Sequence, residues 1–253
     1  MISIRKLRKS YGSGISKNEV FQDFDLEIDP HTIVSLVGPT GCGKTTLLNL
    51  ISKLDMPDSG VVTITIGDPE AIGYMMQNAL LLPWRTLAEN ALLGTEVMRR
   101  RGHETDQLLD FYFDSFDLAG HEHSYPDTSS GGMKQRVALI RTLLVKPKLL
   151  LLDEPFSNLD FDIKLKIQRH LIRYHQMNEA TVLLVTHDIE DAISLSDRVV
   201  VLSEPPTRIK ADISIELGLA RRDPVDARKS SRFSEYFAQI WDELKYLRDN
   251  SND

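Results

Sequence analysis

Strand-like and helix-like patterns alternate along most of the chain. Segments rich in apolar and β-branched residues, which look like strands, occupy residues 32–38, 60–67, 71–77, 148–153, 181–186 and 198–203. Segments with apolar residues at helical spacing lie between them, at residues 44–53, 132–145, 160–176 and 189–195. This alternation predicts an α/β fold built on a largely parallel sheet.

The N-terminal part has a different pattern. Residues 1–7 (MISIRKL) and 20–28 (VFQDFDLEI) alternate polar and apolar positions. Strands show this alternation when one face is buried and the other meets solvent. We therefore expect an antiparallel sheet at the N-terminal edge of the fold.

Residues 87–130 interrupt the alternation of strands and helices. The stretch is polar and helical in pattern, which predicts a small helical subdomain inserted into an α/β core of residues 1–86 and 131–219. Residues 220–253 are predicted to form a helical tail. Its last helix carries an apolar stripe that favours packing on the chain's own core, with contact to a partner subunit as the alternative. The stripe consists of Phe233, Phe237, Ile240, Leu244 and Leu247.

Composition narrows the class of protein. The 253 residues carry a net charge of −7, and the sequence pI is about 5.5, so we expect no nucleic-acid partner. No apolar run approaches the roughly 18 residues of a transmembrane helix, and the N-terminus lacks the apolar core of a secretory signal. The single cysteine, Cys42, excludes an intrachain disulfide.

One segment matches a phosphate-binding loop. Residues 38–45 read G-x-x-x-x-G-K-T between a predicted strand and a predicted helix, the context that this pattern requires. The glycines let backbone N–H groups surround phosphate oxygens, while Lys44 brings positive charge and Thr45 offers a hydroxyl to Mg²⁺. The expected nucleotide-binding residues here are Gly38, Pro39, Thr40, Gly41, Cys42, Gly43, Lys44, Thr45 and Thr46.

Cys42 lies within this loop, close to the start of the predicted helix. A helix N-terminus favours the thiolate form of cysteine. We therefore expect a reactive thiol that bound nucleotide would protect.

An acidic pair follows the leucine-rich strand 148–153. Asp153 stands at the carboxyl end of that strand, where α/β sheets place their ligands, and its carboxylate can hold Mg²⁺ directly or through water. Glu154 is a second carboxylate beside this predicted metal site. It is therefore a candidate general base for an attacking water.

A second candidate anion site lies at residues 128–136 (TSSGGMKQR). Ser130, Gly131 and Gly132 stand directly before a predicted helix, whose first N–H groups and positive dipole end attract anions. The chain thus contains two separate candidate phosphate sites.

Seven segments in a fixed order resemble one protein family, the ATP-binding subunits of ABC transporters. They are Tyr11, GPTGCGKTT (38–46), MMQ (75–77), SSGGMKQR (129–136), LLLLDEP (149–155), SNLD (157–160) and VTHD (185–188). The resemblance covers nearly the whole chain. It implies an ATPase with a P-loop core, a mainly parallel sheet, an antiparallel edge and a helical insert that ends in the signature loop.

The resemblance also implies roles for single residues. Tyr11 would stack on the adenine ring. Gln77 would reach Mg²⁺ and the attacking water, and His187 would bind the γ-phosphate and hold the catalytic group. Catalysis is thus expected of Glu154, His187 and Gln77, and Mg²⁺ binding of Thr45, Gln77 and Asp153.

The second anion site has a distinct role in this family. The loop matching Ser130, Gly131 and Gly132 binds the γ-phosphate of ATP held by a second subunit, and Asp160 would lie at the same interface. Two chains, either identical or from two ATPase genes, would pair head to tail around two ATP molecules. Hydrolysis would remove the shared contact and open the dimer.

Two positions depart from the family's pattern. Ser129 stands where leucine is usual, and Asn158 stands where alanine is frequent. The first departure bears on the tightness of the closed dimer.

The apolar segment Leu80–Trp84 must be buried in the chain's own core or against a partner. The resemblance implies contact with integral membrane permease subunits, attachment to the cytoplasmic face of the inner or cell membrane, and an extracytoplasmic solute-binding protein. The LLPW form and the RRDP tail segment (221–224) look like the importers of nitrate, taurine and alkanesulfonates.

Two other functions fit parts of the pattern. A non-transport ABC ATPase acting on ribosomes or DNA is disfavoured by the single cassette, the short helical insert and the acidic charge. A non-hydrolysing ATP-binding module is disfavoured because Glu154 and His187 fill both catalytic positions.

Overall fold

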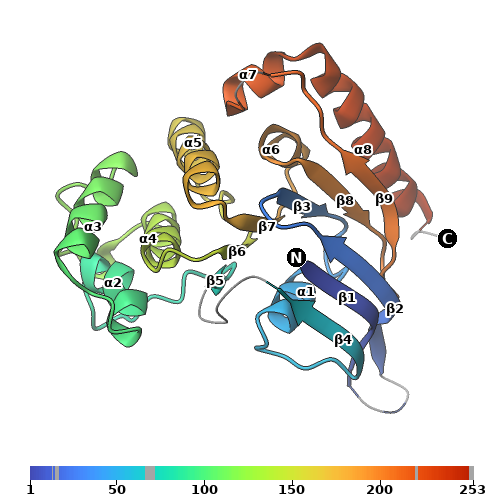
Figure 1. Ribbon diagram of the computed structural model, residues 1–253, viewed down its shortest axis with the longest axis horizontal. Coiled ribbons are helices and arrows are strands. Elements are labelled where there is room, and N and C mark those ends of the chain that lie inside the picture. The colour runs from blue at the N-terminus through green and yellow to red at the C-terminus, as the bar shows by residue number, and fades with distance from the viewer. Residues whose placement is uncertain (13, 15–16, 66–71, 220–221, 251–253) are drawn as a thin grey trace.

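Two sheets and a separate group of helices form the molecule (Figure 1). The computed structural model describes residues 1–12, 14, 17–65, 72–219 and 222–250, with the side chains of 246–250 left out. The smaller sheet is antiparallel, in the order β2 (Asn18–Ile28), β1 (Ile2–Tyr11), β4 (Ser59–Ile64). The expected antiparallel sheet in the N-terminal part is therefore confirmed.

The larger sheet carries five of the six strands predicted after the N-terminal pair. The sixth, predicted at residues 60–67, instead forms β4 of the antiparallel sheet, none of whose residues is buried, and residues 66–67 lie outside the described part. The order of the larger sheet is β5 (Ile72–Met75), β6 (Leu149–Asp153), β7 (Thr181–Val185), β3 (Ile33–Val37), β8 (Arg198–Leu202) and β9 (Ile209–Ser214). The first five are parallel, and β9 runs antiparallel to β8. Every residue of β3, β6 and β7 is buried, which explains why these strands read as continuous apolar runs.

The strand β9 was not among the strands predicted from the sequence, the last of which ended at residue 203. Ile209, Ala211 and Ile213 alternate with the exposed Lys210 and Asp212. This period-two pattern is the normal signal of an edge strand.

The four predicted core helices are present with small shifts at their ends. They are α1 (Lys44–Ile51), α4 (Gly131–Leu144), α5 (Phe161–Asn178) and α6 (Ile189–Leu195). The insert contains α2 (Leu87–Val97), α3 (His103–Ser115) and the 3₁₀ turn η3 (Pro126–Thr128).

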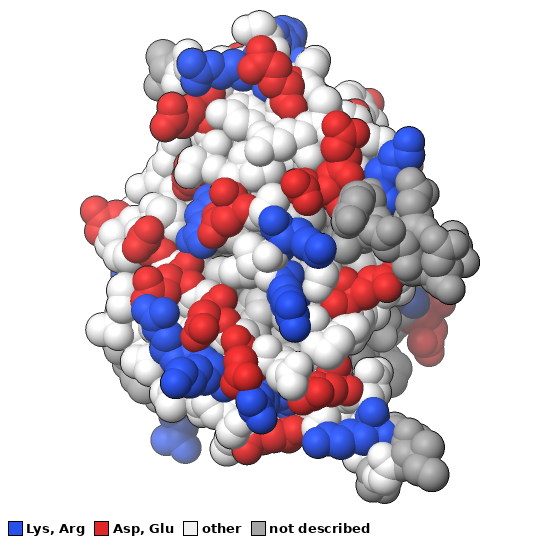
Figure 2. Space-filling model, turned by 90° about the vertical axis from the view of Figure 1, so that its right-hand side faces the viewer, with Lys and Arg blue, Asp and Glu red and all other residues white. Residues whose placement is uncertain are grey.

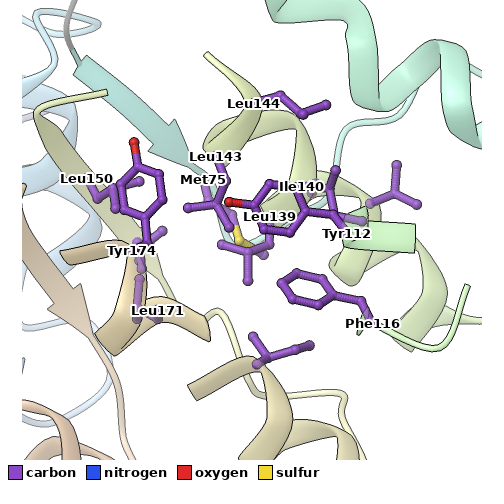
Figure 3. Close-up of a cluster of buried hydrophobic side chains, with 14 of the residues drawn as sticks. Met75, Tyr112, Phe116, Leu139, Ile140, Leu143, Leu144, Leu150, Leu171 and Tyr174 are labelled. Atoms are coloured by element: carbon purple, nitrogen blue, oxygen red, sulfur yellow. The ribbon is translucent and has the colours of Figure 1, made fainter. Parts of the chain in front are cut away.

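The helical insert and the sheet share one hydrophobic cluster, in which α4 is central. Figure 3 shows Ile140 and Leu143 of α4 among Met75 of the sheet, Tyr112 of α3 and Leu171 of α5. All five side chains are at least nine-tenths buried. The helix that follows the predicted insert therefore packs against both parts of the molecule.

The C-terminal tail folds back on the α/β core through α7 (Pro224–Lys229) and α8 (Ser231–Asn250). Phe233 and Ile240 are buried in a cluster with residues of α6, β8 and β9, and Phe237 and Leu244 are partly buried against it. Packing of the apolar stripe on the chain's own core is confirmed for these four residues, and the Leu247 side chain lies outside the described part. No described helix has the length and apolar character needed to span a bilayer.

Basic residues of the tail are paired with acidic ones. Arg222 contacts Asp197 at 2.8 Å, and Arg228 contacts Glu190 at 3.2 Å. Figure 2 shows the side of the molecule on which the C-terminus lies, with lysines and arginines interspersed among aspartates and glutamates. Charge on this face is therefore mixed in sign.

The segment Leu80–Trp84 is exposed at its two ends, and hydrogen bonds with α2 hold its backbone. Trp84 is 72% exposed. The buried Asn90 of α2 accepts a hydrogen bond from Leu82 N–H at 2.7 Å and donates to the carbonyls of Leu82, Arg85 and Thr86. One side chain thus holds the backbone at Leu82, in the middle of the segment, and at the two residues that follow the segment.

We expect Asn90→Ala to lower the free energy of unfolding by about 2–4 kcal/mol, because the Leu82 N–H and the Arg85 carbonyl would lose a partner beside a buried position. Urea denaturation followed by circular dichroism measures the change. The matched control is Gln107→Ala on the exposed face of α3, for which we expect a change below about 0.5 kcal/mol. Equal effects of the two substitutions would contradict the anchoring role of Asn90.

Candidate active site

The carboxyl ends of β3, β5, β6 and β7 meet along one edge of the parallel sheet, and the segments that follow them surround a cavity of about 420 Å³. The lining residues come from stretches far apart in the sequence. They are Tyr11, Val20, Gly38, Thr40, Gly41, Gly43, Lys44, Thr45, Thr46, Gln77, Asp153, Glu154, Ser157, Val185 and His187. The expected nucleotide, metal and catalytic residues thus line one cavity, except Pro39 and Cys42, which are not among the lining residues.

The loop before α1 has the backbone of an anion site. Gly43 has a φ of 95°, and a Cβ there would lie 2.5 Å from Val20 Cγ1, so only glycine fits this position. The first turn of α1 has neither a side-chain cap nor an acidic residue. Its backbone N–H groups are therefore available to a ligand such as phosphate.

The ammonium group of Lys44 lies against the phosphate loop. Its Nζ donates to the carbonyls of Gly38 at 2.8 Å and Pro39 at 2.9 Å. These are neutral acceptors, and a phosphate oxygen would be the stronger partner for the ammonium group.

Thr45 and Asp153 form a pair of hard oxygen ligands. Thr45 Oγ1 donates to Asp153 Oδ2 at 2.7 Å. Burial raises the pKa of Asp153, while the Thr45 hydroxyl and the charge of Lys44 oppose that rise. Mg²⁺ is usually held by one or two carboxylates together with the phosphates of a substrate. The pair, with Gln77 on the wall of the same cavity, fits this mode of Mg²⁺ binding.

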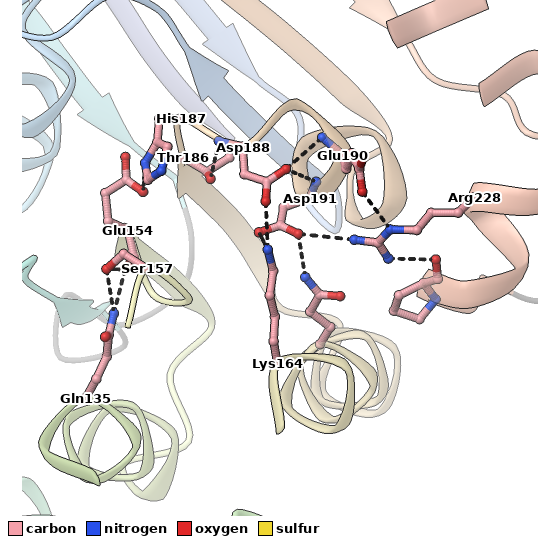
Figure 4. Close-up of polar contacts among 12 residues, drawn as sticks. Gln135, Glu154, Ser157, Lys164, Thr186, His187, Asp188, Glu190, Asp191 and Arg228 are labelled. Carbon is pink, nitrogen blue, oxygen red and sulfur yellow. Dashed lines mark hydrogen bonds and ion pairs between the residues drawn. The ribbon is translucent and has the colours of Figure 1, made fainter. Parts of the chain in front are cut away.

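Glu154 and His187 form the second polar pair of the cavity. His187 Nδ1 lies 2.8 Å from Glu154 Oε2, and the two side chains are 71% and 12% exposed. Figure 4 shows the imidazole directed at the carboxylate. A carboxylate oriented by a second group at hydrogen-bond distance is the arrangement expected of a general base.

Tyr11 is fixed at the mouth of the cavity by residues that the sequence did not point to. Its hydroxyl donates to Asp55 Oδ2 at 2.7 Å. Lys9 Nζ contacts the other oxygen of Asp55 at 2.6 Å and lies 4.9 Å from the Tyr11 ring centroid. The hydrogen bonds from Lys9 and Tyr11 lower the pKa of Asp55 to about 2. Asp55 follows α1 in an irregular segment, so no sequence motif marks it.

The expectation of a reactive Cys42 is wrong. The residue is 0% exposed, and burial raises the pKa of its thiol although Lys44 opposes the shift. A buried thiol with a raised pKa contains little of the nucleophilic thiolate. Cys42 thus fills space beneath the phosphate loop.

The signature loop, residues Ser130, Gly131 and Gly132, lies outside the cavity. Ser130 caps α4 by accepting a hydrogen bond from Met133 N–H at 3.2 Å, and Gly131 is exposed. Neither these residues nor Gly132 and Asp160 are among the residues that line the cavity. The chain therefore does not bring its second candidate anion site to its own phosphate loop.

The departure at Ser129 is accommodated within the chain. Ser129 is buried, and its hydroxyl donates to the Tyr125 carbonyl at 2.8 Å. Its polar group is therefore satisfied without a partner subunit.

Comparison with known proteins agrees with this geometry. Residues 21–157, more than half of the chain, match the family described as "ABC transporter". The "Uncharacterized ABC transporter ATP-binding protein YtlC" of Bacillus subtilis is 40% identical over 94% of this chain and 93% of its own length. The "Aliphatic sulfonates import ATP-binding protein SsuB 1" of Rhodococcus jostii is 44% identical over 73% of this chain and 74% of its own. The "Nitrate import ATP-binding protein NrtD" of a Synechocystis strain is 34% identical over 89% and 86%.

Solved structures give the same result. A dimeric, post-hydrolysis state of an ATP-binding cassette with bound ADP and Pi superposes with a TM-score of 0.77 and 28% identity. The match covers 85% of this chain and 99% of that one. Three observations indicate the same family. They are the P-loop fold, the similar proteins, and the cavity that is lined by the phosphate loop together with Asp153, Glu154 and His187. The chain therefore belongs to the ABC transporter family, among its ATP-binding, ATP-hydrolysing subunits.

Proposed function

We propose that this ATPase subunit energises the import of a small solute through separate membrane subunits, by closing as a homodimer around two ATP molecules and opening after hydrolysis. The observation that carries the proposal is the position of Glu154 in the cavity. Its carboxylate shares the cavity with the phosphate loop and contacts His187 at 2.8 Å.

Different residues of the cavity would have different roles in ATP hydrolysis. The N–H groups at the start of α1 and the Lys44 ammonium bind the outer phosphates. Thr45, Asp153 and Gln77 would hold Mg²⁺, which when bound neutralises charge on the phosphates. Glu154 accepts a proton from the attacking water at its carboxylate, and His187 keeps that carboxylate oriented.

The homodimer is supported by the second anion site. The start of α4 is formed by Ser130, Gly131 and Gly132. None of these three residues lines the chain's own cavity. A site of this kind suits the γ-phosphate of a nucleotide bound by another copy. The similar solved cassette is itself dimeric with ADP and Pi bound.

We infer the membrane partners from the segment Leu80–Trp84, called the docking segment below, and the cargo from the names of the relatives. The exposed Leu80 and Trp84 offer apolar surface to permease subunits, so the chain would be a peripheral protein on the cytoplasmic face of the membrane. The names of the relatives include import of aliphatic sulfonates and of nitrate. We propose nitrate, a sulfonate, taurine or a related small compound as cargo, delivered by an extracytoplasmic solute-binding protein.

We expect Glu154→Gln to lower kcat for ATP by about 10²- to 10⁴-fold, because the amide cannot accept the proton. Nucleotide affinity should be kept, so the variant should accumulate as an ATP-bound dimer in size-exclusion chromatography. The control is Glu235→Gln on the exposed face of α8. Normal turnover by Glu154→Gln would refute the catalytic role.

Gly131→Asp tests the partner site. A Cβ at Gly131 meets no other atom within 4 Å, and aspartate suits the first turn of a helix, so the monomer should fold and bind ATP normally. Repulsion between this carboxylate and the partner's γ-phosphate should weaken ATP-dependent dimerisation by at least about tenfold.

Analytical ultracentrifugation with ATP and without Mg²⁺ measures this dimerisation. The matched control is Gly102→Asp, at the start of α3, where a Cβ also meets no other atom within 4 Å. If both variants dimerise like the unaltered protein, the signature loop does not meet the partner's nucleotide.

A further inference from the structure

Gln135 lies outside the cavity, yet its side chain contacts the segment that carries the candidate base. It belongs to the second turn of α4 and is buried. Its Nε2 donates to the backbone oxygen of Glu154 at 2.6 Å and lies 3.2 Å from Ser157 Oγ, and its Oε1 accepts from Asn158 N–H at 3.2 Å. Figure 4 shows this carboxamide reaching from α4 to the Glu154 segment.

The backbone of Glu154 is in a conformation that needs such support. Its φ is 51°, in the left-handed region that residues other than glycine seldom adopt. Conformations of this kind persist where the surroundings hold them from several sides. The Glu154 N–H donates to Val185 O at 2.9 Å, and its carbonyl accepts from Gln135 and from Ser157 Oγ. The two peptide groups that flank the Glu154 Cα are therefore both held, the first by β7 and the second by Gln135 of α4 together with Ser157.

The start of α4 is also packed tightly against the segment after Glu154. A Cβ at Gly132 would lie 2.8 Å from the Asn158 carbonyl oxygen, so glycine permits this close approach. Gly132 belongs to the signature loop, which opens α4. A displacement of that loop therefore acts on residues 157–158 and, through Gln135, on Glu154.

We propose that Gln135 is a positioning residue for ATP hydrolysis, which aims the Glu154 carboxylate by holding its backbone carbonyl and makes that aim depend on the placement of α4. The inference rests on the proposed role of Glu154 as the base. It links the loop that meets the partner's nucleotide to the base that acts on the chain's own nucleotide, through one buried side chain.

Two substitutions of Gln135 test this role. Gln135→Glu keeps the size and the acceptor toward Asn158 N–H, but loses the amide donor and sets a carboxylate oxygen against the Glu154 carbonyl. Gln135→Met keeps the approximate length without charge, in case the buried carboxylate prevents folding. We expect kcat to fall by about 10- to 100-fold, because small displacements of a catalytic group are costly. KM and the affinity for ATP without Mg²⁺ should change by less than about twofold.

The matched control is Thr142→Val. Thr142 is also buried on α4, and its hydroxyl donates to Ala138 O at 2.9 Å, within the same helix. This variant should keep its kcat. A loss of kcat equal to that of the Gln135 variants would reduce the role of Gln135 to general support of α4 and overturn the proposal.

A double-mutant cycle supplies the decisive measurement. Single-turnover rates are compared for Glu154→Gln with and without Gln135→Met. If Gln135 acts through the Glu154 carboxylate, the second substitution should leave the small residual rate unchanged, so the effects are not additive. The same fold-loss in both backgrounds, or an unchanged kcat in the single variants, would overturn the proposal. An unaltered protein without ATPase activity, or an active Glu154→Gln, would instead refute the proposed function.

Discussion

Parallel pairing of β6, β7 and β3 is the constraint on which the site depends. The three strands are neighbours in register, Leu152 opposite Leu184 and Leu36 opposite Val185, so the segments that follow them emerge at one edge of the sheet. The phosphate loop follows β3, the acidic pair ends β6, and His187 follows β7. A parallel sheet requires its connections to return over the faces, and α1, α4 and α5 bury those faces while leaving the strand ends open.

Burial shifts the pKa of two groups of the site in the same direction, but their other contacts differ. It raises the pKa of both Asp153 and Cys42, because a charge loses its hydration in either case. Asp153 keeps a compensating hydrogen bond from Thr45 and the compensating charge of Lys44, which favour its carboxylate form. Cys42 lies at 3.6 Å from Lys44 Nζ, a weak contact, and behaves as packing. The environment of each group, and not its presence in a motif, decides its chemistry.

The helix α4 connects parts of the molecule that have different tasks. Its N-terminus carries the signature loop, and Gln135 reaches the Glu154 segment. Further along, Arg141 donates to the carbonyl of Leu80, the first residue of the docking segment Leu80–Trp84, and to that of Ala79 just before it. A helix that opens with the signature loop and makes polar contacts to two other segments is suited to move these parts together.

The sequence alone determined the strands and helices of the parallel core, since continuous apolar runs and helical spacing are local properties of the chain. It also determined the phosphate loop and the acidic pair, because each motif is contiguous. The edge strand β9 was missed, although Ile209, Ala211 and Ile213 alternate with polar residues, because an edge strand leaves a weaker apolar signal than a buried one.

Only the tertiary structure decided which of these residues meet. Three features depend on contacts between segments distant in sequence, which no local pattern encodes. They are the hydrogen bond from Tyr11 to Asp55, the hydrogen bond from Gln135 to the Glu154 carbonyl, and the burial of Cys42. The separation of Ser130–Gly132 from the chain's own cavity is decided in the same way, since it follows from where the packing of α4 places its first turn.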